Sequence, residues 1–219
     1  MGHGVELAAA DGHRLSAYLA EPAGTPRGGI VVIQEIFGVT SHIRSVADQY
    51  ADAGFTALAP ALFDRVERGV DVPYTDIAKG FRYMKTMKNA KVLLDAQAAI
   101  DDVRAAGKVG VLGFSWGGTV AYLAAARLEI DAAVVYYGGQ IRRYLCYKPR
   151  CPVLFHFGRK DAHIAPETVE RIKAANPQGI FHLYPAEHGF NCADRACFEP
   201  ASAKLALKRS VEFLHRTLG

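Results

Sequence analysis

Long hydrophobic runs are missing from this 219-residue sequence. No apolar stretch approaches the roughly 18 residues that a membrane-spanning helix needs, so we predict no membrane span. The first residues, MGHGVELAAADGH, also lack the charged start and apolar core of a secretory signal peptide. Together these two absences predict a cytoplasmic protein.

A strong charge of either sign is missing too. Lysine and arginine number 26 against 22 for aspartate and glutamate, and the basic residues are scattered. Nucleic-acid-binding domains gather their basic residues in a patch or stripe, so we expect no nucleic-acid partner. The hydrophobic fraction of 50% is ordinary for a globular protein. A chain of this length fits a single α/β domain, which we place at residues 1–219.

Cysteine is scarce, and its spacing excludes the common zinc motifs. The four cysteines stand in two groups along the sequence, Cys146 with Cys151 and Cys192 with Cys197, and four residues separate the two members of each group. Zinc sites prefer the tighter C-x-x-C spacing, so we expect no metal site. Without a secretion signal, four free thiols in a reducing cytosol are the simplest interpretation. A disulfide within or between the pairs stays open if the protein is exported by another route.

What the chain does have is a regular alternation of apolar strands and amphipathic helices. A hairpin is predicted over residues 4–21, with Asp11-Gly12 at its turn. Ser41 is the expected N-cap of the first helix, which Gly54 ends. Further strands are predicted at 29–33, 55–59, 109–112, 132–137, 152–157 and 180–184, and helices at 42–53, 76–86, 90–106, 119–128, 166–175 and 201–217. Such alternation favours an α/β fold, a mainly parallel sheet with helices on both faces.

Residues 60–89 are the least regular part of the chain, with several prolines, glycines and charges. Long connections of this kind in α/β proteins commonly cover or line an active site. We therefore expect this segment beside the functional site.

One motif carries chemistry: Gly113-Phe114-Ser115-Trp116-Gly117 has the form G-x-S-x-G. It stands between a predicted strand and a predicted helix, the context in which this motif holds a nucleophilic serine on a sharp turn. Glycines are needed because a Cβ at either flank would clash. The hydroxyl would lie at a helix N-terminus, where free N–H groups favour negative charge. A glycine-rich turn with an incidental serine is the alternative.

A serine hydroxyl needs a base to accept its proton. On an open α/β sheet, ligands bind beyond the carboxyl ends of the strands. Of the eight histidines, His188 lies in a loop that directly follows the last predicted strand. Asp161 follows the strand at 152–157 and would fix the tautomer of that imidazole. The order Ser115, Asp161, His188 is that of the α/β-hydrolases, so we predict that fold.

Attack on a carbonyl creates an oxyanion, which two preorganised donors must stabilise. The N–H of Trp116, directly after the serine, is the first candidate. The second is the N–H of Ile36, in the loop after the strand at 29–33.

Four segments together resemble the dienelactone hydrolase family of α/β-hydrolases. They are Gln34-Glu35-Ile36-Phe37-Gly38, Gly113-Phe114-Ser115-Trp116-Gly117-Gly118, His156-Phe157-Gly158 with Asp161, and His188-Gly189-Phe190-Asn191. The resemblance covers nearly the whole chain. It implies a compact hydrolase without a large lid, acting on a lactone or small ester that often bears a carboxylate. It also implies a role for Glu35 beside the nucleophile; a buried carboxylate paired with an arginine is the alternative.

This chain departs from the family at the nucleophile. Well-known members carry a cysteine where this sequence has Ser115, and there the glutamate can help to govern ionisation of the thiol. A hydroxyl is not ionised in that way, so we expect His188 to act as the base. Glu35 would then orient water or shape the pocket.

Substrate contacts are less sharply marked. Family members hold a substrate carboxylate with arginines, and the candidates here are Arg82 and Lys79, in the irregular segment, and Arg195, after the histidine loop. Phe37 is a further candidate contact. For each of the three cations, a solvated surface charge is the alternative.

We therefore predict a serine hydrolase that cleaves a carboxylic ester or lactone, possibly an anionic one, through an acyl-enzyme. We expect no metal or organic cofactor, and a monomer or small homo-oligomer. One alternative is a non-catalytic relative that binds a ligand without turnover. Another is an acyltransferase or small peptidase, in which a different nucleophile resolves the same acyl-enzyme.

Overall fold

A mainly parallel sheet forms the centre of the computed structural model, which describes residues 2–219. Its strand order is β1-β2-β4-β3-β5-β6-β7-β8. The first two strands form the predicted antiparallel hairpin, and β2 also pairs antiparallel with β4, whereas every other neighbouring pair is parallel. The strands are β1 (His3–Ala8), β2 (Arg14–Ala20), β3 (Gly29–Ile33), β4 (Thr56–Pro60), β5 (Val109–Phe114), β6 (Ala132–Tyr136), β7 (Val153–Gly158) and β8 (Ile180–Tyr184). The predicted α/β fold is confirmed.

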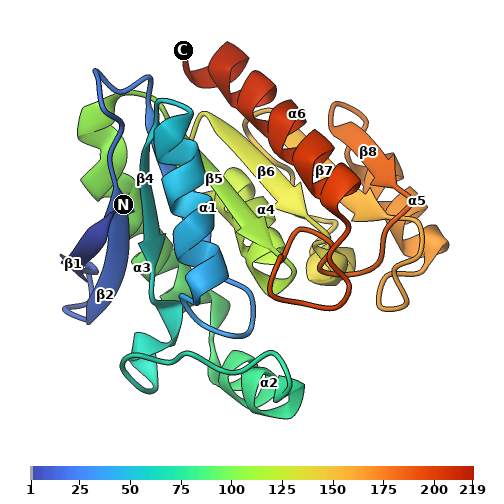
Figure 1. Cartoon of the computed structure of the whole chain (residues 1–219), viewed down its shortest axis with the longest axis horizontal. Coiled ribbons are helices and arrows are strands. Elements are labelled where there is room, and N and C mark those ends of the chain that lie inside the picture. Colours follow the sequence, from blue (N-terminus) through green and yellow to red (C-terminus); the bar gives the residue numbers. More distant parts are fainter. Residues whose placement is uncertain (1) are drawn as a thin grey trace.

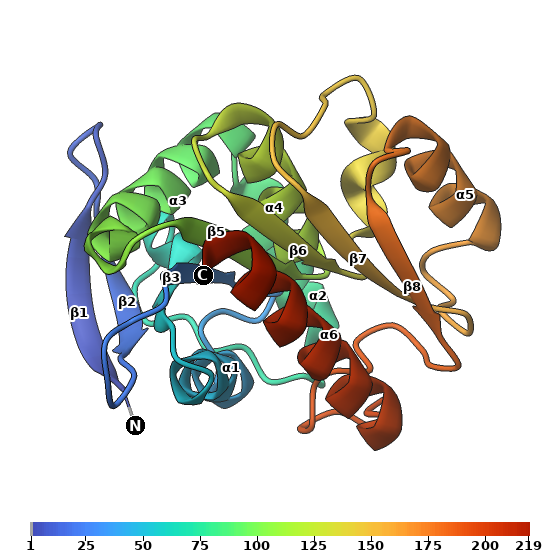
Figure 2. The same cartoon turned by 90° about the horizontal axis from the view of Figure 1, so that it is seen from above.

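Helices cover both faces of this sheet. Helices α1 (Ser41–Asp52) and α6 (Pro200–Leu218) lie on one face, and α3 (Asn89–Val103), α4 (Trp116–Arg127) and α5 (Pro166–Ala175) lie on the other (Figure 1, Figure 2). Every residue of β3, β5, β6 and β7 is buried as a result. This burial explains why these strands are continuous apolar runs rather than alternating ones.

Several helix ends differ from the prediction, and α4 begins at Trp116 rather than at residue 119. Thr40, not Ser41, caps α1: its Oγ1 accepts a hydrogen bond from the Ile43 N–H at 3.5 Å, and the helix begins at Ser41. Thr40 has the extended backbone that a cap needs. The predicted helix at 90–106 ends earlier, at Val103, and continues as a 3₁₀ turn, η2 (Arg104–Ala106).

The irregular segment after β4 contains the 3₁₀ turn η1 (Leu62–Arg65) and the short helix α2 (Ile77–Thr86). Figure 1 shows α2 beyond the carboxyl ends of the parallel strands. The segment is tied to the loop after β3 by a hydrogen bond of 2.8 Å from the Val72 N–H to the Phe37 carbonyl. It therefore lies beside the edge of the sheet at which ligands bind in this fold.

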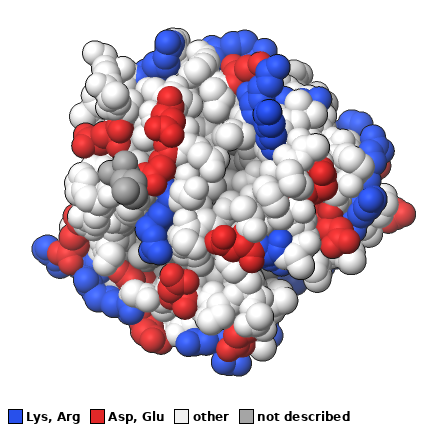
Figure 3. Space-filling model, viewed as in Figure 1, with Lys and Arg blue, Asp and Glu red and all other residues white. Residues whose placement is uncertain are grey.

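Charges of both signs are interspersed on the face seen in Figure 3. Among residues 2–219, no helix is both long enough and apolar enough to cross a membrane.

Candidate active site

Ser115 lies on a strained turn between β5 and α4. Its φ is 53° and its ψ is −112°, a conformation that residues other than glycine rarely adopt. The flanking positions need glycine for the steric reason predicted from the sequence. A Cβ on Gly113 would lie 2.1 Å from the Gly117 carbonyl oxygen. A Cβ on Gly117 would lie 2.3 Å from the carbonyl oxygen of Gln34. The turn is thus packed directly against the loop after β3.

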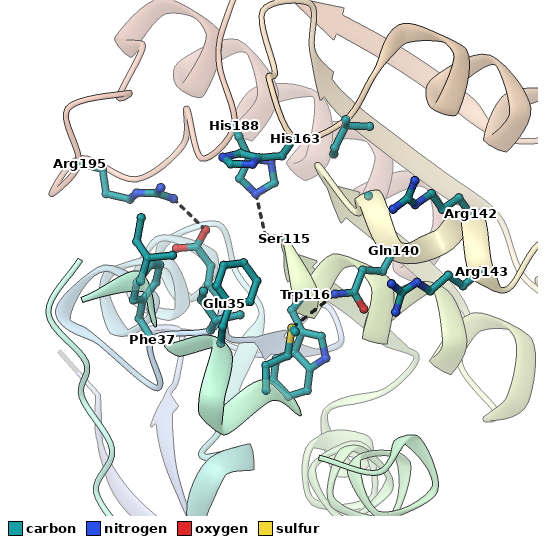
Figure 4. A pocket seen from close by; sticks show the side chains of 16 residues that line it. Glu35, Phe37, Ser115, Trp116, Gln140, Arg142, Arg143, His163, His188 and Arg195 are labelled. Atoms are coloured by element: carbon teal, nitrogen blue, oxygen red, sulfur yellow. Dashed lines mark hydrogen bonds and ion pairs between the residues drawn. The ribbon is translucent and has the colours of Figure 1, made fainter. Parts of the chain in front are cut away.

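The structure brings the three predicted triad residues together. Ser115 Oγ lies 2.8 Å from His188 Nε2, and His188 Nδ1 lies 2.7 Å from Asp161 Oδ2. Figure 4 shows the imidazole of His188 directed at Ser115. The Asp161 side chain is almost fully buried, so its charge acts on the imidazole with little screening by water. Asp161 Oδ1 also accepts hydrogen bonds from the N–H groups of His163 and Ile164, which fix the carboxylate.

The predicted oxyanion donors are the backbone N–H groups of Trp116 and Ile36, and this assignment stays a prediction. Trp116 is the first residue of α4, so its N–H is one of the free amides of the helix N-terminus. The N–H of Ile36 has no backbone acceptor within the described chain. Both residues line the cavity that contains Ser115.

That cavity has a volume of about 310 Å³, the size of a small-molecule site. Phe37 lines it, as predicted. Helix α2 contributes three apolar side chains, Ile77, Phe81 and Met84. The 3₁₀ turn η3 (Gly139–Arg143), which follows β6, forms another part of the wall, where Gln140 Nε2 lies 3.5 Å from Met84 Sδ of α2.

Glu35 is buried in the wall of the cavity and pairs with Arg195. Its Oε1 lies 3.7 Å from Arg195 Nη1, and the carboxylate side chain is only 2% exposed. Burial raises the pKa of Glu35, and the electrostatic interactions of its carboxylate with Arg195 and with His188 oppose that rise. Gly189 makes room for the arginine, because a Cβ there would lie 2.3 Å from Arg195 Nη1. The arginine-paired carboxylate, the alternative raised from the sequence, is present.

The two cations predicted in α2 do not reach this cavity, and their assignment is corrected. Lys79 and Arg82 line a separate depression on the other side of the helix, together with Val66 and Tyr83. The cavity-facing side chains of α2 follow the spacing i, i+4 and i+7, so they occupy one face. Residues 79 and 82 fall outside that face.

Four polar residues of the cavity were missed from the sequence: Gln140, Arg142, Arg143 and His163. Figure 4 places the two arginines and Gln140 across the cavity from Arg195. A signal for them existed, because η3 directly follows the carboxyl end of β6. The same positional rule selected His188 after β8.

Comparisons with known proteins find similar sequences and structures. A family model described as "Dienelactone hydrolase family" matches residues 15–218. A protein of Azospirillum brasilense described as "Putative carboxymethylenebutenolidase" is 35% identical over 230 residues, covering 98% of this chain and 99% of that protein. The "Carboxymethylenebutenolidase" of Pseudomonas putida is 31% identical over 229 residues, covering 96% and 95%. The crystal structure of a "Putative Dienelactone Hydrolase" from Klebsiella pneumoniae subsp. pneumoniae MGH 78578 superimposes with a TM-score of 0.86 at 30% identity. That match covers 97% of this chain and 98% of the other.

Proposed function

The chain belongs to the dienelactone hydrolase family, and we propose that it hydrolyses a small carboxylic ester or lactone through an acyl-enzyme on Ser115. The observation that carries the proposal is the unbroken hydrogen-bonded series from Ser115 Oγ through His188 to Asp161. It supplies a nucleophile, a base and a carboxylate that orients the base.

In the first half-reaction, Ser115 Oγ attacks the carbonyl carbon while His188 Nε2 takes the hydroxyl proton. The N–H groups of Ile36 and Trp116 stabilise the oxyanion of the tetrahedral intermediate. When this intermediate collapses, the ester C–O bond breaks and His188 returns the proton to the leaving alcohol. A lactone keeps its alcohol attached to the acyl group.

In the second half-reaction, water replaces the alcohol. His188 takes a proton from the water as its oxygen attacks the acyl carbon, and then returns the proton to Ser115 Oγ. The products are a carboxylic acid and an alcohol, or one hydroxy acid from a lactone. This cycle needs no external cofactor, so activity should survive exhaustive chelation.

With a serine nucleophile, we assign Glu35 the role of holding Arg195 and shaping the cavity wall. Support comes from the ion pair and from the burial of the carboxylate. We assign the role of base for the Ser115 hydroxyl to His188, whose Nε2 lies 2.8 Å from Ser115 Oγ.

We further propose that the substrate carries a carboxylate. Three arginines but only one carboxylate line the cavity, and that carboxylate, Glu35, is already paired with Arg195. Arg142 and Arg143 form no ion pair within residues 2–219, which leaves their charges available to a ligand. Guanidinium groups match the planar geometry of a carboxylate.

Substitution of the nucleophile tests the proposed reaction. Ser115→Ala should lower kcat for p-nitrophenyl esters by at least about 10⁴-fold, because the acyl-enzyme is no longer formed. A fluorophosphonate probe should label the wild type and not the variant. Ser45→Ala, on the exposed side of α1, is the matched control and should keep full activity.

The alternatives give different results in the same experiments. A folded wild-type protein that neither reacts with the probe nor turns over any ester would be a ligand-binding relative. Acyl transfer to an added alcohol or amine in preference to water would identify a transferase. Cleavage of a small peptide in preference to every ester would identify a peptidase.

We also place this enzyme in the cytoplasm, as a monomer or small homo-oligomer. The four cysteines support a reducing location, since all are free thiols in the described chain. Light scattering on the purified protein measures the oligomeric state.

A further inference from the structure

Helix α2 is seated directly on the residue that carries one proposed oxyanion donor. Gly80 is the single buried residue of α2. A Cβ at this position would lie 2.6 Å from the carbonyl oxygen of Ile36 and 3.0 Å from its Cγ1. A backbone oxygen cannot be approached so closely by a carbon atom without displacement. The distance between α2 and Ile36 therefore depends on the missing side chain at position 80.

The same segment holds the residues that follow Ile36. The Phe37 carbonyl accepts the hydrogen bond from Val72, and the rings of Phe37 and Tyr74 meet edge to face with centroids 4.7 Å apart. A Cβ on Gly38, whose φ is +93°, would lie only 1.9 Å from the Val70 carbonyl oxygen. Residues 70–80 thus form a clamp on the loop at 36–38, which we call the loop clamp.

The other side of the loop is also closely packed. Gly117 of the nucleophile turn approaches the Gln34 carbonyl so closely that a Cβ would lie 2.3 Å from it. The backbone around Ile36 is therefore held between α4 and the loop clamp.

We propose that Gly80 is a positioning residue for the oxyanion hole. It does not line the cavity and acts only through Ile36, whose N–H must lie about 2.7–3.1 Å from the oxyanion to stabilise it. The inference rests on the hydrolase function proposed above. A methyl group at position 80 would lift α2 or push Ile36 and so misplace this donor.

For the stability of α2 as a helix, an alanine at position 80 is favourable rather than harmful. Alanine favours a helix interior by about 1 kcal/mol over glycine, so Gly80→Ala does not weaken α2 as a helix. A loss of kcat with little change in KM then reports on the contact with Ile36 and not on a weaker helix. The variant adds one methyl group and removes nothing.

The test compares Gly80→Ala with Lys79→Ala, a neighbour in α2 that faces away from the cavity. On a neutral p-nitrophenyl ester, Gly80→Ala should lower kcat by roughly 10- to 100-fold with little change in KM, because one oxyanion donor is misplaced. Lys79→Ala should match the wild type. An alkyl boronic acid, which forms a tetrahedral adduct with Ser115 Oγ, should lose affinity by a similar factor, whereas a carboxylic acid product should not.

A kcat within twofold of the wild type in folded Gly80→Ala would overturn the inference, as would equal losses of boronic acid and product binding. If Gly80→Ala does not fold, Tyr74→Phe tests the same loop clamp. It removes the 2.9 Å hydrogen bond between Tyr74 Oη and Thr40 Oγ1 and adds no atoms. A several-fold fall in kcat is then expected, and an unchanged kcat overturns the inference. A wild type without esterase activity would instead refute the proposed function.

Discussion

Asp161 divides its two carboxylate oxygens between separate tasks. Oδ1 accepts the N–H groups of His163 at 2.8 Å and of Ile164 at 3.1 Å, while Oδ2 contacts His188 Nδ1 at 2.7 Å. The backbone therefore fixes which oxygen faces the imidazole. This arrangement favours a proton on Nδ1, which leaves Nε2 free to accept the proton of Ser115 in the proposed reaction.

Replacing this carboxylate by an amide should reverse the tautomer. In Asp161→Asn, the two backbone N–H groups require the amide oxygen at the Oδ1 position, so the NH₂ group faces His188 Nδ1. The imidazole proton then moves to Nε2, which can no longer act as a base. We expect kcat to fall by about 10⁴-fold at neutral pH, with little change in melting temperature.

The matched control for this variant is Asp131→Asn. Asp131 Oδ2 also accepts a backbone N–H, that of Val109, but the residue does not line the Ser115 cavity. Its activity should stay within a few-fold of the wild type. Loss of less than tenfold in Asp161→Asn would argue against the proposed role of Asp161.

Among the elements, η3 and α2 line the cavity with chemically different side chains. Helix α2 presents Ile77, Phe81 and Met84, whereas η3 presents Arg142 and Arg143. The base of η3 is fixed, since Ile141 is fully buried. A substrate with an apolar part and a carboxylate fits this lining, with its apolar part against α2 and its carboxylate at η3.

The η3 arginines should select for charge. For the double variant Arg142→Ala/Arg143→Ala, we expect kcat/KM on the p-nitrophenyl monoester of glutaric acid to fall roughly ten- to a hundredfold, the value of a charge-assisted bond. The value for neutral p-nitrophenyl valerate should hardly change. Arg82→Ala, on the far side of α2, is the control and should affect neither ester. Equal losses on both esters would contradict the charge-selection proposal.

At the scale of the whole molecule, the closely packed interior holds histidines that fold in the neutral state. Burial lowers the pKa of His42 to about 4, with the Arg195 charge acting in the same direction and Asp194 opposing it. His42 Nε2 is buried and lacks a hydrogen-bond partner within residues 2–219. The unfolded chain, by contrast, protonates a histidine near pH 6.5.

This difference predicts how stability depends on pH. Below pH 6.5 the unfolded state binds a proton at His42 that the folded state does not bind until about pH 4, so the free energy of unfolding falls as the pH falls through this window. Between pH 7 and pH 5, the contribution of His42 amounts to about 2 kcal/mol.

His42→Phe, which keeps an aromatic side chain against Phe114, should remove that contribution. Urea unfolding at pH 7 and pH 5 measures it, and the variant should lose about 2 kcal/mol less than the wild type over this interval. If the free energy of unfolding fell by the same amount in both proteins, His42 would not be the source of this pH dependence. Other buried histidines, such as His156, are present in both proteins, so their contributions to the pH dependence cancel in the comparison.

The sequence by itself determined the elements of the sheet and the three residues at its carboxyl edge. Strand and helix periodicity is local, and parallel strands bring their carboxyl ends to one edge whatever their exact order. Ser115, Asp161 and His188 could therefore be placed together from their positions after strands alone. That the chain forms one domain stays a prediction, although the described strands share one sheet.

Only the tertiary structure decided what surrounds those three residues. The direction of a short helix in an irregular connection depends on distant partners: in α2, Gly80 lies against Ile36, and Lys79 and Arg82 lie outside the cavity. The pairing of Glu35 with Arg195 likewise joins residues 160 positions apart through space. No local pattern encodes such contacts, because they depend on packing between segments whose separation along the chain carries no periodic signal.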